Sequence, residues 1–88
     1  MSTNNNIIFK IRLRIKGLRT EKALTQEKLA ALSGVDYKHI QLLESKNPPA
    51  ARIDTLEKIC FGFSIGLDDF FHHEIFEKQG ENGEFRDR

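Results

Sequence analysis

Apolar residues recur every three or four positions along most of the chain, with polar and charged residues between them. This period is typical of amphipathic helices. The first predicted helix covers residues 8–22, and its apolar positions are Ile8, Ile11, Ile15 and Leu18. The alternating run FKIRLRIKG also suits a strand, but no second strand pattern follows that could pair with it. We therefore expect a helix, despite a cost of about 1 kcal/mol for Gly17 in its interior.

Residues 25–45, TQEKLAALSGVDYKHIQLLES, contain two short helical patterns separated by a corner. Their apolar positions are Leu29, Leu32, Val35, Ile40 and Leu43. Thr25 and Asp36 can each cap the N-terminus of one of these helices. Gly34 lies where the first helix must stop, and glycine tolerates the positive φ of such a corner. Two helices joined by a corner of about four residues form the helix-turn-helix pattern.

The second helix of this motif, about residues 36–45, leaves an unusual set of side chains exposed. They are Tyr37, Lys38, Gln41 and Leu42. Such a set can bond base edges and phosphates in a major groove and can contact a thymine methyl group. A solvated helix face would more often carry Glu and Lys pairs. The pattern therefore favours DNA binding, with an ordinary amphipathic hairpin of a small bundle as the alternative.

A proline loop and two more helices follow the motif. The loop covers residues 45–52, SKNPPAAR, because paired prolines exclude a helix. The next helix, residues 53–63, has the apolar positions Ile53, Leu56, Ile59, Cys60 and Phe63. The fifth, residues 67–76, carries more large apolar residues than a core of this size needs to bury. This surplus predicts a dimer interface, with packing against the first helix as the alternative; its residues would be Phe70, Phe71, Ile75 and Phe76.

Composition limits the classes of protein that fit. Eighty-eight residues with an apolar fraction of 39% make one small domain, residues 8–76. We expect residues 1–7 and 77–88 to be flexible ends. The single cysteine, Cys60, allows no internal disulfide and no cysteine-based zinc site, and we expect it to be a small core residue. No run has the length of a membrane span, and the N-terminus lacks a signal-peptide pattern. We therefore expect a cytoplasmic protein that has no membrane partner.

No arrangement typical of catalysis or of a cofactor site stands out. The sequence has no serine–histidine–aspartate order, no phosphate-cradling glycine loop and no metal-ligand spacing. His72, His73 and Glu74 are adjacent, but neighbouring residues point in different directions around a helix. We therefore expect no enzyme, no cofactor and no metal.

The net charge of +1 conceals two oppositely charged halves. Residues 1–52 hold ten Lys and Arg against four acids, a net charge of +6. Residues 53–88 hold four bases against nine acids, a net charge of −5. On the first helix we expect the exposed bases to be Arg12, Arg14, Lys16 and Arg19. The basic half is the one that carries the helix-turn-helix pattern, as a surface that faces phosphates requires.

The order TQ-x-x-LA, SGV and I-x-x-x-E resembles the Cro/cI-type (XRE) helix-turn-helix family. The matching residues are Leu18, Arg19, the runs 24–30 and 33–35, Ile40, Leu43, Glu44 and DTLEKI at 54–59. The resemblance covers residues 11–71 and implies an all-α, compact five-helix domain. Small members that resemble the chain in size include phage repressors and the controller proteins of restriction–modification systems.

The resemblance also implies roles for single residues. In phage repressors, the residues matching Arg19 and Glu44 form a partly buried ion pair, which we favour here over a phosphate contact by Arg19. Tyr37 and Lys38 match positions that read bases in phage repressors, where glutamine often stands. Since neither residue is glutamine here, the bases that the family reads cannot be carried over. We expect Gln41 and Leu42 to contact bases as well. The residues expected at phosphates are Thr25, Gln26, His39, Ser45, Lys46 and Asn47.

From these observations we expect a sequence-specific regulator that binds double-stranded DNA. It would act as a homodimer on a palindromic operator, with residues 36–45 in the major groove. Repression would come from covering a promoter, and activation would need a contact with the polymerase. The alternative is an antitoxin-like interaction module whose phenylalanine-rich fifth helix binds a partner protein.

Overall fold

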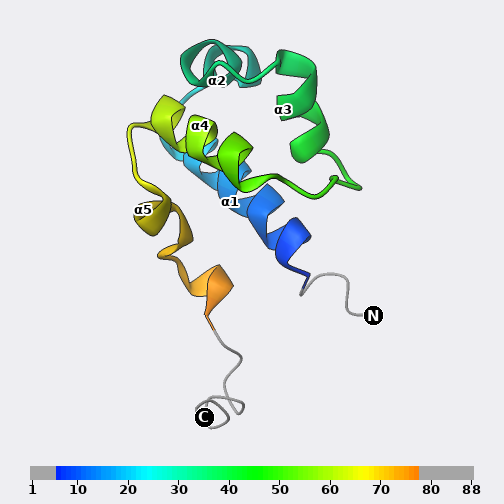
Figure 1. The fold of residues 1–88 in the computed structure, drawn as a ribbon, viewed down its shortest axis with the longest axis vertical. Coiled ribbons are helices and arrows are strands. Elements are labelled where there is room, and N and C mark those ends of the chain that lie inside the picture. Colours follow the sequence, from blue (N-terminus) through cyan, green and yellow to red (C-terminus); the bar gives the residue numbers. More distant parts are fainter. Residues whose placement is uncertain (1–5, 78–88) are drawn as a thin grey trace, which may run out of the picture.

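The computed structural model of the chain describes residues 6–77, and every regular element within that range is helical (Figure 1). Five α-helices are followed by one short 3₁₀ helix. Their bounds are α1 Ile7–Glu21, α2 Gln26–Ser33, α3 Tyr37–Leu43, α4 Ile53–Phe63, α5 Leu67–Phe71 and η2 Glu74–Phe76. The predicted all-α, five-helix architecture is therefore confirmed, and the first segment is a helix and not a strand.

Every α-helix contributes to one core. Its members without solvent exposure include Ile15, Leu29, Ile40, Ile59 and Phe70. In Figure 1, α4 crosses in front of α1, α2 and α3 lie above and beside it, and α5 with η2 lies below. The helices α2 and α4 approach each other closely at Gly62. A Cβ atom added at this position would lie only 3.0 Å from the Ser33 Cβ.

Short polar side chains fix where the helices begin. The Asn6 carboxamide accepts the Ile8 N–H at 2.7 Å, so α1 begins at Ile7. This corrects the expectation that residues 1–7 are all flexible, since Asn6 and Ile7 belong to the helix; residues 1–5 lie outside the described range. Thr25 accepts the Lys28 N–H at 3.0 Å and Asp36 accepts the Lys38 N–H at 3.2 Å. Both predicted caps of the motif are present.

Gly34 ends α2 in the left-handed conformation. Its φ is +77°, and its N–H donates to the Ala30 carbonyl at 2.9 Å. A side chain at this φ would press its Cβ against the following carbonyl oxygen. The corner between α2 and α3 therefore has the conformation that the sequence predicted for it.

The predicted helix over residues 67–76 is wrong as a continuous element. The helix α5 ends at Phe71, His72 and His73 are not helical, and η2 forms a separate turn. Arg14 on α1 satisfies the carbonyls at this point: its Nε donates to the Phe70 carbonyl at 2.7 Å, and its Nη2 donates to the Asp69 carbonyl, which also accepts the His72 N–H, at 2.8 Å. These carbonyls would otherwise accept the N–H groups of the next helical turn.

This break redirects the phenylalanines that we expected at a dimer interface. Phe70 is fully buried in the core, and Phe71 and Phe76 pack against that core. The rings of Phe70 and Phe71 lie 5.0 Å apart, edge to face, as do those of Phe71 and Phe76. Phe70 is thus a core residue and not an interface residue. Phe71, Ile75 and Phe76 are partly exposed, and their part in a dimer stays a prediction.

Two residues predicted to face inward are exposed instead. Leu32 retains 42% of its surface and Ile53 retains 63%. Leu32 lies in the last turn of α2, and Ile53 is the first residue of α4. Cys60 is buried as expected, and its burial raises the pKa of the thiol to about 11. Cys60 is therefore an unreactive core residue at neutral pH.

Candidate nucleic-acid interface

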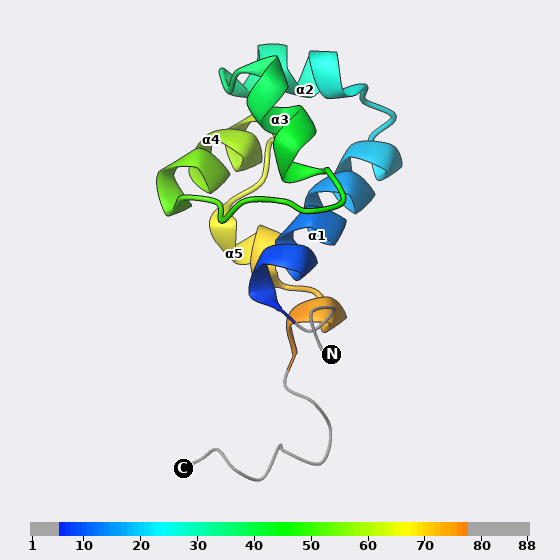
Figure 2. The same cartoon turned by 90° about the vertical axis from the view of Figure 1, so that its right-hand side faces the viewer.

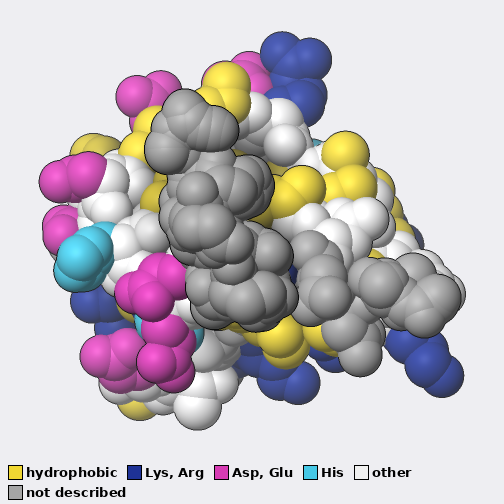
Figure 3. Space-filling view, turned by 90° about the horizontal axis from the view of Figure 1, so that it is seen from below, with side chains coloured by type: hydrophobic (Ala, Val, Ile, Leu, Met, Phe, Trp, Pro, Cys, Tyr) yellow, Lys and Arg dark blue, Asp and Glu magenta, His cyan; other side chains and the backbone are white. Residues whose placement is uncertain are grey.

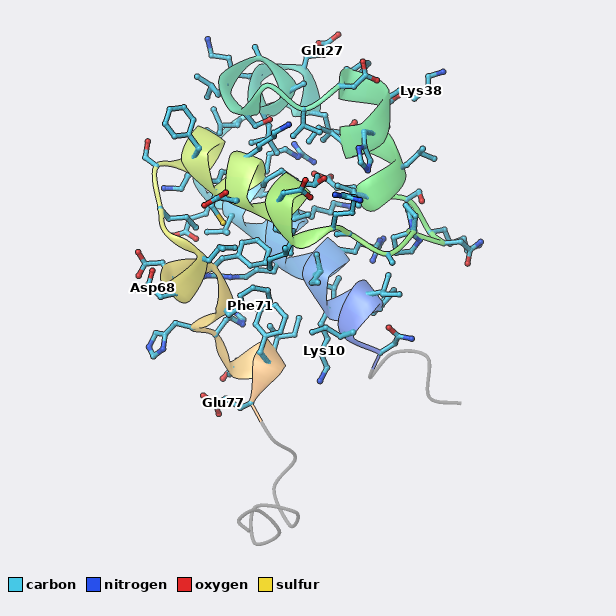
Figure 4. The ribbon with its side chains drawn as sticks, viewed as in Figure 1. Lys10, Glu27, Lys38, Asp68, Phe71 and Glu77 are labelled. Atoms are coloured by element: carbon cyan, nitrogen blue, oxygen red, sulfur yellow. The ribbon has the colours of Figure 1, made fainter. Side chains whose placement is uncertain are left out.

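The helix α3 presents its outer side to solvent. It runs from Tyr37 to Leu43, with Asp36 and Glu44 as its caps, so it is slightly shorter than the predicted range 36–45. The four side chains predicted to point outward are all exposed: Tyr37, Lys38, Gln41 and Leu42. Figure 4 shows Lys38 projecting away from the other helices.

A hydrogen bond along α3 orients two of these residues. The Gln41 Nε2 donates to the Tyr37 hydroxyl at 3.2 Å, one helical turn away. Gln41 keeps its carbonyl oxygen and its second N–H for a ligand. Adenine presents a matching donor and acceptor in the major groove. The amide is therefore held on the helix surface with a donor and an acceptor still free, and a contact of Gln41 with a base stays a prediction.

A buried carboxylate fixes the end of α3 to α1. Arg19 donates to both Glu44 carboxylate oxygens, from Nε at 2.8 Å and from Nη2 at 2.9 Å. Only 3% of the Glu44 side chain is exposed, so the pair is shielded from water. The hydrogen bonds with Glu44 raise the pKa of Arg19 further, and the guanidinium stays charged. The ion pair implied by the family resemblance is thus present in the structure.

Gln26 joins the same network. Its Nε2 donates to Glu44 Oε1 at 3.1 Å, so the first residue of α2 is tied to the last turn of α3. The network sets the relative position of the two helices of the motif. A phosphate contact by Gln26, which retains one amide N–H and its oxygen, stays a prediction.

Arg12 is a second anchor that sequence reasoning missed. Its Nε donates to the Glu44 carbonyl at 3.2 Å, and its guanidinium lies 5.1 Å from the centre of the Phe9 ring. Arg12, Arg14 and Arg19 were expected to line the exposed side of α1. Instead each donates to another part of the domain, so the expectation is wrong for Arg12 and Arg14, while Arg19 forms the pair with Glu44 that we favoured. The spacing of Arg12 and Arg19, two helical turns, was the signal that they share one face.

The residues predicted at phosphates surround the exposed side of α3. Lys46 and Asn47 are exposed, and with Arg12 they line a groove of about 540 Å³ between the start of α1 and the loop after α3. The Ser45 hydroxyl donates to the Leu42 carbonyl at 2.7 Å. His39 is partly buried, and the Thr25 hydroxyl is occupied by its capping bond. Their contacts with phosphate stay predictions.

A family model described as the Cro/C1-type HTH DNA-binding domain matches residues 14–74, more than half of the chain. The chain belongs to the Cro/C1-type helix-turn-helix family. In this Cro/C1-type domain, α2 and α3 are the two helices of the motif, as the sequence pattern predicted. A search of curated proteins and a search of solved structures returned no match. No helix in the described part of the chain has the length and apolar character that a membrane crossing requires.

Proposed function

We propose that the protein is a sequence-specific transcriptional regulator that binds a palindromic operator in double-stranded DNA as a homodimer. The observation that carries the proposal is the exposed side of α3, which combines base-reading groups on a helix anchored by Arg12, Arg19 and Gln26. Anchored side chains lose less conformational freedom on binding than mobile ones do.

Each exposed side chain of α3 has a matching group in a major groove. Lys38 can donate to guanine O6 and N7, and Gln41 can bond adenine N6 and N7. Leu42 would contact a thymine methyl group, and Tyr37 would donate to a phosphate or pack against a sugar. The sequence read by the protein would then depend on the order in which these groups meet the bases.

The residues flanking α3 would hold the DNA backbone. Ser45, Lys46 and Asn47 follow the C-terminal end of α3, and Gln26, the first residue of α2, is bonded to Glu44 at that same end. Thr25 caps the N-terminal end of α2, and His39 belongs to α3. The charge distribution supports this orientation. Viewed from the α5 and η2 end, acidic side chains gather on one side of the domain (Figure 3). The exposed acids of α5, of η2 and of the residue after it are Asp68, Asp69, Glu74 and Glu77.

Two copies on a two-fold operator would place their α3 helices in major grooves about 34 Å apart. Repression would follow where such a site overlaps a promoter. We propose that the protein acts in the cytoplasm by binding and not by catalysis. The antitoxin-like alternative has less support, because it relied on a phenylalanine-rich helix whose central ring, Phe70, is buried.

The test is a binding titration with the DNA upstream of the protein's own gene and with a scrambled duplex. We expect a preference of about a hundredfold or more for the upstream DNA. Replacing both Lys38 and Gln41 by Ala should remove most of that preference, because both groups would read bases. Circular dichroism should show an unchanged fold, since both side chains are exposed.

Lys16→Ala is the matched control, because Lys16 is an exposed base on α1 away from the motif. The preference of this variant for the upstream DNA over the scrambled duplex should equal that of the natural protein. If the double substitution leaves the discrimination intact, α3 does not read the sequence and the proposal fails.

A further inference from the structure

The outer face of α4 is exposed and partly apolar, and the DNA interface does not use it. Phe61 retains 77% of its surface, the largest exposure among the large apolar residues of the described chain. Ile53 lies eight residues earlier, at the start of the same helix. Positions spaced by four lie on one side of a helix, so Ile53, Glu57 and Phe61 follow one stripe. The stripe has an apolar residue near each end and a charge in the middle.

A hollow adjoins Phe61. Its volume is about 560 Å³, and its apolar wall includes Leu32 at the end of α2 and Ile65 after α4. Gly62 and Gly66 line it with backbone atoms, which leaves room for a side chain from outside. The exposed ring and the hollow beside it therefore lie together at the C-terminal end of the stripe, and Ile53 lies at the other end.

The charges at the centre of the stripe are also self-complementary. Glu57 and Lys58 are exposed neighbours, and neither takes part in an ion pair within residues 6–77. If a second α4 packs antiparallel about a two-fold axis between positions 57 and 58, each Glu57 meets Lys58 of the second copy. Phe61 then lies opposite the start of the second α4, where Ile53 is exposed.

We propose that the outer face of α4, comprising Ile53, Glu57, Lys58 and Phe61, is a self-association surface on which a second copy packs its own α4 antiparallel. In Figure 2, α3 is nearest the viewer and α4 lies beside it, so this contact leaves the exposed side of α3 uncovered. A contact centred on one helix is smaller than the roughly 1,200–2,000 Å² of stable interfaces. The association is therefore weak and depends on protein concentration.

The first test is sedimentation equilibrium of the full chain without DNA, so that its result does not depend on the proposed function. Phe61→Ser should raise the dissociation constant of the dimer about tenfold or more, since Phe61 is the largest exposed apolar side chain of the proposed surface and aromatic residues dominate such contacts. The thermal stability of the monomer should not fall, because Phe61 packs little in its own chain. The matched control is Leu13→Ser, because Leu13 is also exposed and apolar but lies on α1 and not on α4. This substitution should leave the association unchanged.

Charge reversal distinguishes a second copy from any other partner. Glu57→Lys and Lys58→Glu should each weaken self-association, because each places like charges opposite one another twice. The double variant E57K/K58E should restore it. An equimolar mixture of the two single variants should form heterodimers, which native mass spectrometry can count.

Three results would overturn the proposal. One is a chain that stays monomeric at every concentration reached. Another is a dimer that Phe61→Ser leaves intact but Ile75→Ser dissociates, which would assign the contact to η2 and not to α4. The third is a double variant that associates no better than the single ones, because the central charges would then not face each other.

Discussion

At the level of single residues, Gly34 and Gly17 differ in backbone conformation. Gly34 has φ +77° at the end of α2, whereas Gly17 lies inside α1 with ordinary helical geometry. A Cβ atom added at either position would meet no atom within 4 Å. Any difference between the two substitutions therefore reports backbone conformation and not steric contact.

Gly34→Ala should lower the free energy of unfolding by about 1–2 kcal/mol, because alanine disfavours the left-handed region. Gly17→Ala should raise it by about 0.5–1 kcal/mol, because glycine loses more backbone entropy in a helix than alanine does. Urea denaturation of both variants measures these changes. Two shifts of the same sign would contradict this account of the corner.

At the level of elements, α1 holds the ends of two other helices. Arg12 donates to the carbonyl that ends α3, and Arg14 donates to two carbonyls that end α5. The last carbonyls of a helix lack partners within it, so an arginine from another helix satisfies them. The end of α3 and the last turn of α5 are therefore both held by side chains of α1.

Arg14→Met keeps much of the aliphatic stem but removes both donors. Since the Asp69 and Phe70 carbonyls would lose these partners, we expect local opening of α5 and η2 to become easier by about 1–3 kcal/mol. Amide hydrogen exchange from Phe70 to Phe76 should accelerate accordingly, whereas Lys16→Met should not change it. Equal exchange in both variants would mean that Arg14 does not hold this end of the domain.

At the level of the whole molecule, the basic half contains the motif and the acidic half contains α4, α5 and η2. If DNA binds at the motif, the basic half meets the phosphates and the acidic half should lie away from them. Part of the affinity should then come from release of counterions and should fall as salt rises.

Lys46→Ala should weaken binding to operator and to scrambled DNA by similar factors, because a phosphate contact carries no base information. The slope of log K against log salt should become less steep by about one unit. Titrations at several salt concentrations measure both effects, with Lys16→Ala as the control. A loss confined to the operator would instead place Lys46 at a base.

The sequence by itself determined the features whose cause is local. Thr25 and Asp36 cap their helices with their own side chains, and Gly34 supplies the positive φ of the corner. Helical periodicity sufficed to predict the exposed side of α3, because its core positions, Ile40 and Leu43, are spaced three apart. The resemblance supplied the pair of Arg19 and Glu44, which are 25 residues apart.

Only the tertiary structure decided the features that depend on distant partners. Periodicity tells which side of a helix is apolar, but not how much of that side its neighbours cover. Leu32 and Ile53 are therefore exposed although they fit the apolar pattern, and Phe70 is buried although it seemed surplus. Arg14 holds the end of α5 from 55 residues away, through carbonyls that every residue possesses and that leave no signal in the sequence.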